Sequence, residues 1–222
     1  MKKQVIATFL ALMLTVPLMS GCGKQSEQPD SAIESTAAET SAAADTTDSA
    51  QEDETFTYDG TFNEEVFQHI TQNIELFGHK VSMPCTLADL GEEFSTGEDN
   101  PYVDTEYSFV IYSLYFNEQQ IGQITYNCDH ELSETELKTL SFYNLSVSQY
   151  TADQNDSSIS GFTLQDTFQQ VQDALGTPTD ASGYNDNGKG YVRYALTESQ
   201  NISFFINQDQ SIREIAVQVA SE

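Results

Sequence analysis

Residues 23–55 contain Ile33 as their only large apolar side chain and consist mostly of Ser, Thr, Ala and acids. Such a segment cannot bury enough apolar surface to offset the entropy lost on ordering. We therefore expect residues 22–55 to form a disordered acidic linker with an r.m.s. span of roughly 30 Å. The folded part is then confined to residues 56–222, a length that suits one domain or two small ones.

The N-terminus is typical of an export signal. Lys2 and Lys3 precede residues 5–19, an uncharged stretch shorter than the roughly 20 apolar residues that a membrane-spanning helix needs. The "SGC" at residues 20–22 resembles the bacterial lipobox, although Met19 stands where that motif usually has Leu. The resemblance implies that residues 1–21 are a cleaved lipoprotein signal peptide and that a lipidated Cys22 anchors the chain at the extracytoplasmic face of the cell membrane. The alternative is an ordinary secretory signal that a cysteine happens to follow.

The charge limits the possible partners. The chain has 8 Lys+Arg against 35 Asp+Glu, a net charge of −27. Cleavage after residue 21 would remove two lysines and no acid, which gives −29. This balance is adverse to binding of nucleic acids and of anionic lipid surfaces, since both need a basic footprint, and we expect no nucleic-acid partner. We interpret the charge as a source of solubility, with a specific cationic partner as the alternative.

Two sequence elements occur twice in the same order. "TLADL" at 86–90 returns as "TLQDT" at 163–167, and residues 113–126 ("SLYFNEQQIGQITY") return as residues 203–217 ("SFFINQDQSIREIAV") with one insertion. Thr86 and Thr163 suit helix N-caps, with Asp89 and Asp166 three residues on. The order predicts two tandem units, residues 56–150 and 151–222, joined near 149–158. Chance similarity among hairpins is the alternative.

Apolar spacing supplies the elements of each unit. We expect helices from Leu87 to Phe94, and from Leu164 to Leu175 before Gly176. Period-two patterns predict strands at 107–116, 121–126, 137–147, 191–196, 202–206 and 215–219, and a hairpin that turns at residues 77–78. The predicted fold is therefore α+β, with a short capped helix and an antiparallel β-meander in each unit.

This arrangement is similar to the β-lactamase inhibitor proteins and to the small lipoprotein subunit of the outer-membrane assembly machine. The stretch "MPCTLADL" also resembles an element of uncharacterised lipoproteins from Gram-positive anaerobes. The resemblance covers residues 70–219 and rests on the Thr-x-x-Asp helix starts and on "DALGTP" at 173–178. It implies an α+β fold and binding to other proteins, and it carries over no catalytic residue.

No motif predicts catalysis, a metal or a cofactor. His69, His79 and His130 do not pair at helical spacing, and HExxH, CxxC and GxSxG are absent from the sequence. The twelfth position from Asp186 is Thr197, so no EF-hand loop closes there. A site assembled from distant residues remains an alternative.

Cys85 and Cys128 are the thiols that follow the linker. Export would permit a disulfide between them. Buried free cysteines are also common, and both alternatives stay open at this point. A third hypothesis is that one of these cysteines acts as a nucleophile beside a histidine, although we expect both to have a structural role.

One strand face is a candidate binding surface. If helices cover one side of the second meander, Tyr191, Arg193, Ser203 and Phe205 project from the other. Tyr and Arg are residues that protein interfaces favour. The alternatives are that the two units pack through this face or that it is ordinary solvated sheet. Tyrosines that would extend the surface are Tyr102, Tyr107 and Tyr115.

Together these features predict a lipid-anchored, non-catalytic module that binds an unknown protein or cell-envelope polymer. An accessory subunit of an envelope assembly or transport complex, held by its helices, is the alternative. The remaining possibility is an enzyme whose site cannot be read from sequence.

Overall fold

The computed structural model describes residues 56–97, 100–149 and 156–220. They belong to one compact unit that spans residues 53–222. The predicted signal peptide, Cys22 and the linker lie outside the described residues, as does most of the predicted boundary at 149–158. Within the described ranges, no helix is long and apolar enough to cross a bilayer.

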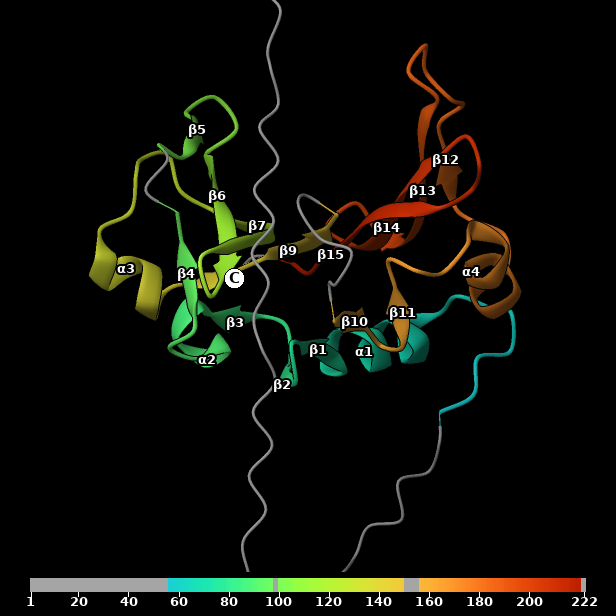
Figure 1. Ribbon diagram of the computed structural model, residues 1–222, viewed down its shortest axis with the longest axis horizontal. Coiled ribbons are helices and arrows are strands. Elements are labelled where there is room, and N and C mark those ends of the chain that lie inside the picture. The colour runs from blue at the N-terminus through green and yellow to red at the C-terminus, as the bar shows by residue number, and fades with distance from the viewer. Residues whose placement is uncertain (1–55, 98–99, 150–155, 221–222) are drawn as a thin grey trace, which may run out of the picture. The chain divides into compact units, whose positions relative to one another are not determined.

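A nine-stranded antiparallel sheet dominates the fold (Figure 1). Its strands run in the order β12-β13-β14-β15-β9-β7-β6-β4, and β5 also pairs with β6. Their bounds are β4 (Phe94–Thr96), β5 (Tyr102–Asp104), β6 (Phe109–Phe116), β7 (Gln119–Tyr126), β9 (Asn144–Ser148), β12 (Asp180–Ala181), β13 (Lys189–Thr197), β14 (Gln200–Asn207) and β15 (Ile212–Gln218).

Two hairpins form a second, four-stranded sheet. Its order is β11-β10-β1-β2, with β1 (Ile74–Leu76), β2 (His79–Val81), β10 (Ser157–Ile159) and β11 (Phe162–Thr163). The turns at 77–78 and 160–161 both place a non-glycine and then a glycine at positive φ, as a tight two-residue hairpin requires. A short pair, β3 (Cys85–Thr86) with β8 (Ser141–Phe142), completes the strands of the described residues.

Four helices lie within the described ranges: α1 (Glu64–Gln72), α2 (Leu87–Leu90), α3 (Glu134–Thr139) and α4 (Phe168–Leu175). Each begins at a side chain that accepts a backbone N–H, and α2, α3 and α4 carry full capping boxes. Figure 1 shows α4 near β12 and β13, and α2 and α3 near the β4 end of the large sheet.

Alternation along the strands divides the large sheet into two faces. One packs on the core, and the opposite one, which carries Tyr191 and Phe205, is called the open face. On β14 the core face carries Ile202, Phe204 and Ile206, all buried. The four-stranded sheet covers part of this face, since Phe162 of β11 lies 5.5 Å from Phe204, centroid to centroid. The hydroxyl of Tyr194 donates to the Gly176 carbonyl beyond α4 (3.0 Å). One core therefore contains residues from both predicted units.

The structure confirms the α+β class, the antiparallel meander of 191–219 and the hairpin at 77–78. The predicted helix from Leu87 to Phe94 is wrong in length: α2 ends at Leu90, and Phe94 enters strand β4, where its side chain is buried. Gly91, at a φ of +114°, ends the helix because its backbone adopts a conformation that side chains disfavour.

The predicted start of α4 and the predicted strand at 137–147 are also wrong. Thr163 and Asp166 bond to each other ahead of the helix, and Thr167 is the actual N-cap, so that α4 begins four residues later than expected. Leu137 belongs to α3, because Ser133 and Glu136 form a capping box, and the extended residues are 141–142 in β8 and 144–148 in β9. The two errors are opposite: Thr163 and Asp166 make a turn where a helix start was predicted, whereas Ser133 and Glu136 start a helix where a strand was predicted.

Gly122 tests the junction between β7 and β9. A Cβ atom at this position would overlap the Ser146 carbonyl and lie 3.1 Å from the Val147 Cα. We expect Gly122→Ala to lower the free energy of unfolding by about 3 kcal/mol in urea titrations. Gly183→Ala is the matched control, because open space surrounds its Cα, and its effect should stay within about 0.5 kcal/mol. Equal effects of the two substitutions would contradict this packing.

Candidate functional site

The four predicted binding residues share one face of the large sheet, which we call the open face. Tyr191 lies opposite Phe205 across β13 and β14, and Arg193 lies opposite Ser203. The two rings are 6.2 Å apart, centroid to centroid. Their strand neighbours, such as Phe204, point to the core. The structure thus brings all four together, and their role in binding stays a prediction.

Asp180 joins Tyr191 to Arg193. It lies on β12, opposite Arg193, and its Oδ2 accepts a hydrogen bond from the Tyr191 hydroxyl (3.0 Å). Arg193 Nη2 lies 3.5 Å from the same oxygen. The hydrogen bond and the negative charge of Asp180 raise the pKa of Tyr191, because both favour the protonated phenol. Sequence reasoning missed Asp180, since a two-residue edge strand gives no periodic signal.

Arg213 is the second residue that sequence reasoning missed. Its guanidinium carbon lies 5.2 Å from the centroid of the Phe205 ring, in a cation–π arrangement. A β-bulge makes this possible, because Phe205 pairs with Glu214 and Ile206 pairs with Ile212, which leaves Arg213 as the extra residue. Two consecutive polar residues between Ile212 and Ile215 are the sequence signal that could have revealed it.

Glu214 lies between Phe205 on β14 and Ser148 on β9. Burial raises the pKa of the Glu214 carboxyl, while the Ser146 hydroxyl and the Arg213 guanidinium oppose that rise. Its Oε2 lies 3.8 Å from Arg213 Nη1, too far for a hydrogen bond. Glu214 is therefore a weak counter-ion for Arg213.

Small polar residues continue the open face across the centre of the sheet. Ser146 on β9 lies between Gln123 of β7 and Ala216 of β15. Beyond it, the Gln120 amide donates to the Ser113 hydroxyl (3.2 Å). The open face therefore has aromatic and charged side chains over β12–β15 and short polar side chains over β9, with hydrogen-bonded polar groups over β7 and β6.

The tyrosines proposed to extend the surface do not join the first group. Tyr102, in β5, and Tyr107, in the β5–β6 connection, are highly exposed, at 60% and 72%. Tyr115 lies on β6, opposite Gln120. Strands β9 and β7 separate all three from β15 and Arg213.

Both cysteines of the described residues are free thiols, so the open alternative of a disulfide is not realised in the structure. Cys85 is buried in β3 with its Sγ 3.9 Å from the Met83 Sδ. Burial raises the pKa of the Cys85 thiol to about 12, which disfavours the nucleophilic thiolate. The Cys128 Sγ contacts the His130 carbonyl (3.3 Å).

The histidines are scattered over three environments. His69 stacks on Phe56 at 3.8 Å, and His79 meets Phe94 edge to face at 5.2 Å. His130 is exposed beside Asp129, and the hydrogen bond between them raises the pKa of His130. Within the part of the chain that the structure describes, no group of three or more His, Cys, Asp or Glu residues could hold a metal ion.

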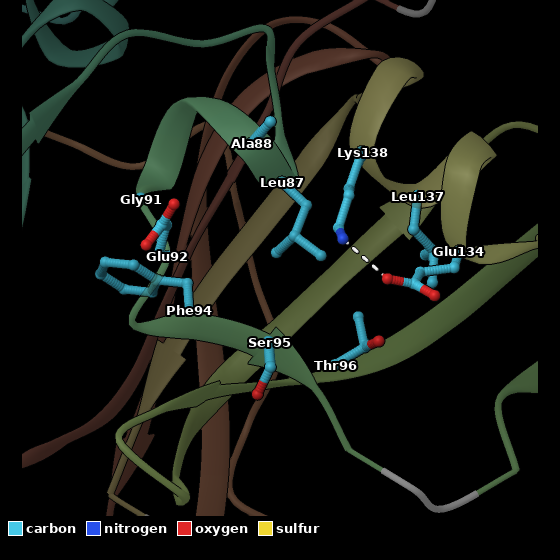
Figure 2. A pocket seen from close by; sticks show the side chains of 10 residues that line it. All are labelled: Leu87, Ala88, Gly91, Glu92, Phe94, Ser95, Thr96, Glu134, Leu137 and Lys138. Atoms are coloured by element: carbon cyan, nitrogen blue, oxygen red, sulfur yellow. Dashed lines mark hydrogen bonds and ion pairs between the residues drawn. The ribbon is translucent and has the colours of Figure 1, made fainter.

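A second candidate surface lies on the helical side. A partly open cavity of about 700 Å³ is bounded by α2, β4 and α3, and we call it the α2–α3 groove (Figure 2). Leu87, Phe94 and Leu137 give it an apolar lining. Figure 2 shows Lys138 and Glu134 joined on the α3 side, where their ion pair measures 2.7 Å.

No family model matches the chain, and neither a curated protein nor a solved structure matches it. The resemblance to β-lactamase inhibitor proteins and to the assembly-machine lipoprotein therefore remains a prediction. The functional reading rests on the geometry of the two candidate surfaces.

Glu214 provides a pH test of this geometry. A carboxyl whose pKa is raised in the fold stays protonated there while the unfolded chain already ionises, so stability falls as pH rises from the ordinary pKa to the raised one. We expect wild type and Glu214→Gln to unfold alike at about pH 4, and the variant to become relatively more stable toward about pH 7. Thermal melts across this range measure the difference. A difference that does not change with pH would contradict a buried, neutral-favouring Glu214.

Proposed function

We propose that the protein is a lipid-anchored, non-catalytic module that binds another protein through the open face, outside the cytoplasmic membrane. The observation that carries the proposal is the row formed by Asp180, Tyr191, Phe205 and Arg213 on a sheet face opposite the core. Tyr, Phe and Arg that hold each other in fixed geometry are the residue types that dominate binding energy at interfaces. They need little further ordering on contact, which lowers the entropic cost of binding.

The strand order supports two tandem units as part of this proposal. A hairpin, a helix and a meander occur twice: β1-β2, α2 and β6-β7-β9, then β10-β11, α4 and β13-β14-β15. In both sheets the antiparallel pair at the junction joins corresponding strands, β1 with β10 and β9 with β15. With this correspondence β6 matches β13, so the sequence alignment of 113–126 with 203–217 is offset by one strand. A doubled sheet gives the open face twice the width of one meander.

The export signal and Cys22 support the proposed lipid anchor. Two acyl chains hold a protein stably at a bilayer, where one chain gives only reversible binding. The acidic linker would hold the folded unit at about 30 Å from the surface. The net negative charge opposes close contact with anionic lipid, which leaves the open face available to a partner.

The α2–α3 groove supports a second candidate function, an accessory subunit held by its helical side. Its apolar lining could receive an apolar side chain or helix from a larger complex. Ala88 is exposed where α2 borders the groove, so a large residue at this position would block entry without disturbing the core.

Cys22→Ser tests the anchor. We expect the wild-type protein in the membrane fraction and the variant in the soluble extracytoplasmic fraction, because the variant lacks the thiol that receives the lipid. Mass spectrometry of the N-terminal peptide should show a diacylglyceryl group on wild type only. A variant that stays with the membrane would refute anchoring through Cys22.

Cross-linking in intact cells separates the two surfaces. We expect a protein captured by wild type and by Ala88→Arg to be lost from Arg193→Glu with Phe205→Ala, with capture reduced about tenfold or more. Both variants are compared with wild type by thermal melting, so that loss of folding is recognised. Capture that survives the double substitution and fails in Ala88→Arg would move the site to the α2–α3 groove.

A further inference from the structure

The Arg213 guanidinium is fixed in place yet has no hydrogen-bond acceptor in the described chain. The Phe205 ring lies against the guanidinium on one side, and the Arg213 side chain is 29% exposed. The nearest acidic oxygen, from Glu214, lies 3.8 Å away, and the buried Arg213 Nε lacks an acceptor. A guanidinium with unused donors, held over an aromatic ring, is pre-organised for a planar anion.

Arg193 also has a buried Nε without an acceptor among the described residues, but its Nη2 has a carboxylate oxygen within hydrogen-bond distance. Asp180 lies 3.5 Å from Arg193 Nη2 and on the neighbouring strand, so this arginine already has a carboxylate partner. Glu214 Oε2 lies 3.8 Å from Arg213 Nη1, beyond hydrogen-bond distance, so Glu214 competes weakly for Arg213. The sequence contains two arginines, and the one without a close carboxylate lies nearer the centre of the sheet.

The surroundings of Arg213 limit the kinds of ligand that its guanidinium could bind. Arg213 covers a face of the Phe205 ring, so that face cannot serve as a stacking platform for a sugar. A polyanion would be repelled by a chain of net charge −27. One carboxylate on an otherwise neutral or basic protein meets both conditions, since the rest of such a partner complements the acidic surface.

We infer that Arg213 binds a carboxylate side chain of the partner protein, an Asp or Glu that descends onto the open face beside Phe205. The inference rests on the proposed function and names the chemistry of its central contact. Ser203 on β14 is half-buried, whereas Ser146 and Ser148 on β9 are buried, so the partner approaches Arg213 over β14.

A titration of the intact folded protein tests the carboxylate. The sequence has two arginines, so a spectrum of arginine Nε–Hε groups contains two side-chain signals, and the Arg213 signal is the one absent from Arg213→Lys. The probe is N-acetylglutamate N-methylamide, which has one carboxylate. Its neutral isostere is N-acetylglutamine N-methylamide, and inorganic phosphate at equal ionic strength is the third probe.

We expect the acidic probe to shift the Arg213 signal saturably in the millimolar range, and the amide to leave it unchanged. Read from the backbone amides of Phe205 and Glu214, Arg213→Lys and Arg213→Gln should bind the probe about tenfold more weakly. Lys138→Gln is the charge-matched control, since Lys138 pairs with Glu134 at the α2–α3 groove, and it should bind as wild type does. Equal shifts from the amide, a stronger response to phosphate, or equal losses in Lys138→Gln and Arg213→Gln would each overturn the inference.

Photo-cross-linking from position 203 tests the protein source. The expected cross-linked segment of the partner contains an Asp or Glu whose change to the amide reduces cross-linking, and Arg213→Lys in this chain has the same effect. A segment that contains no acid, or that is insensitive to Arg213→Lys, overturns the carboxylate contact and leaves binding through the open face standing. If the probe binds but no protein is cross-linked, the carboxylate does not come from a partner protein, and the proposed function is also overturned.

Discussion

The antiparallel pairing of β9 with β15 holds the two halves of the fold together. Leu145 lies opposite Val217 and Val147 opposite Ile215, and all four side chains are fully buried. Without this pairing, each meander would present an unpaired edge and half of a core. The same register places Ser148 beside Glu214, so the pairing that closes the core also makes the open face continuous across the junction.

Strands whose alternation continues over several residues could be predicted from the sequence, whereas the nine-residue helix α1 was not predicted. The alternation of Val192, Tyr194, Ile202 and Phe204 specified two strands and their core face, and both were confirmed. The short elements α3, β10 and β12 could not be predicted, because two to six residues carry too little periodic signal. Helix starts failed where a threonine and an acid three residues on made a turn of their own, as Thr163 and Asp166 do.

The sequence predicted which residues of the candidate site share a face, because it predicted the strands that carry them. Tyr191, Arg193, Ser203 and Phe205 share a face because strand alternation requires it once the core face is known. Their partners could not be predicted. Asp180 arrives from a separate edge strand, and Arg213 reaches Phe205 through a bulge that strict alternation does not contain. A period-two pattern thus identifies which side chains share a face, and long-range pairing decides which of them touch.

Because of the β-bulge, Arg213 lies outside the alternation of β15 that places apolar side chains in the core. It contributes instead to the surface of the sheet. If Arg213 is removed from the strand, Ile212, Glu214 and Ile215 alternate regularly, with both isoleucines facing the core. The extra residue therefore adds nothing to the apolar pattern and supplies only a cation above Phe205. A chain built in this way can acquire, change or lose its central surface charge in the course of evolution while its core pattern remains the same.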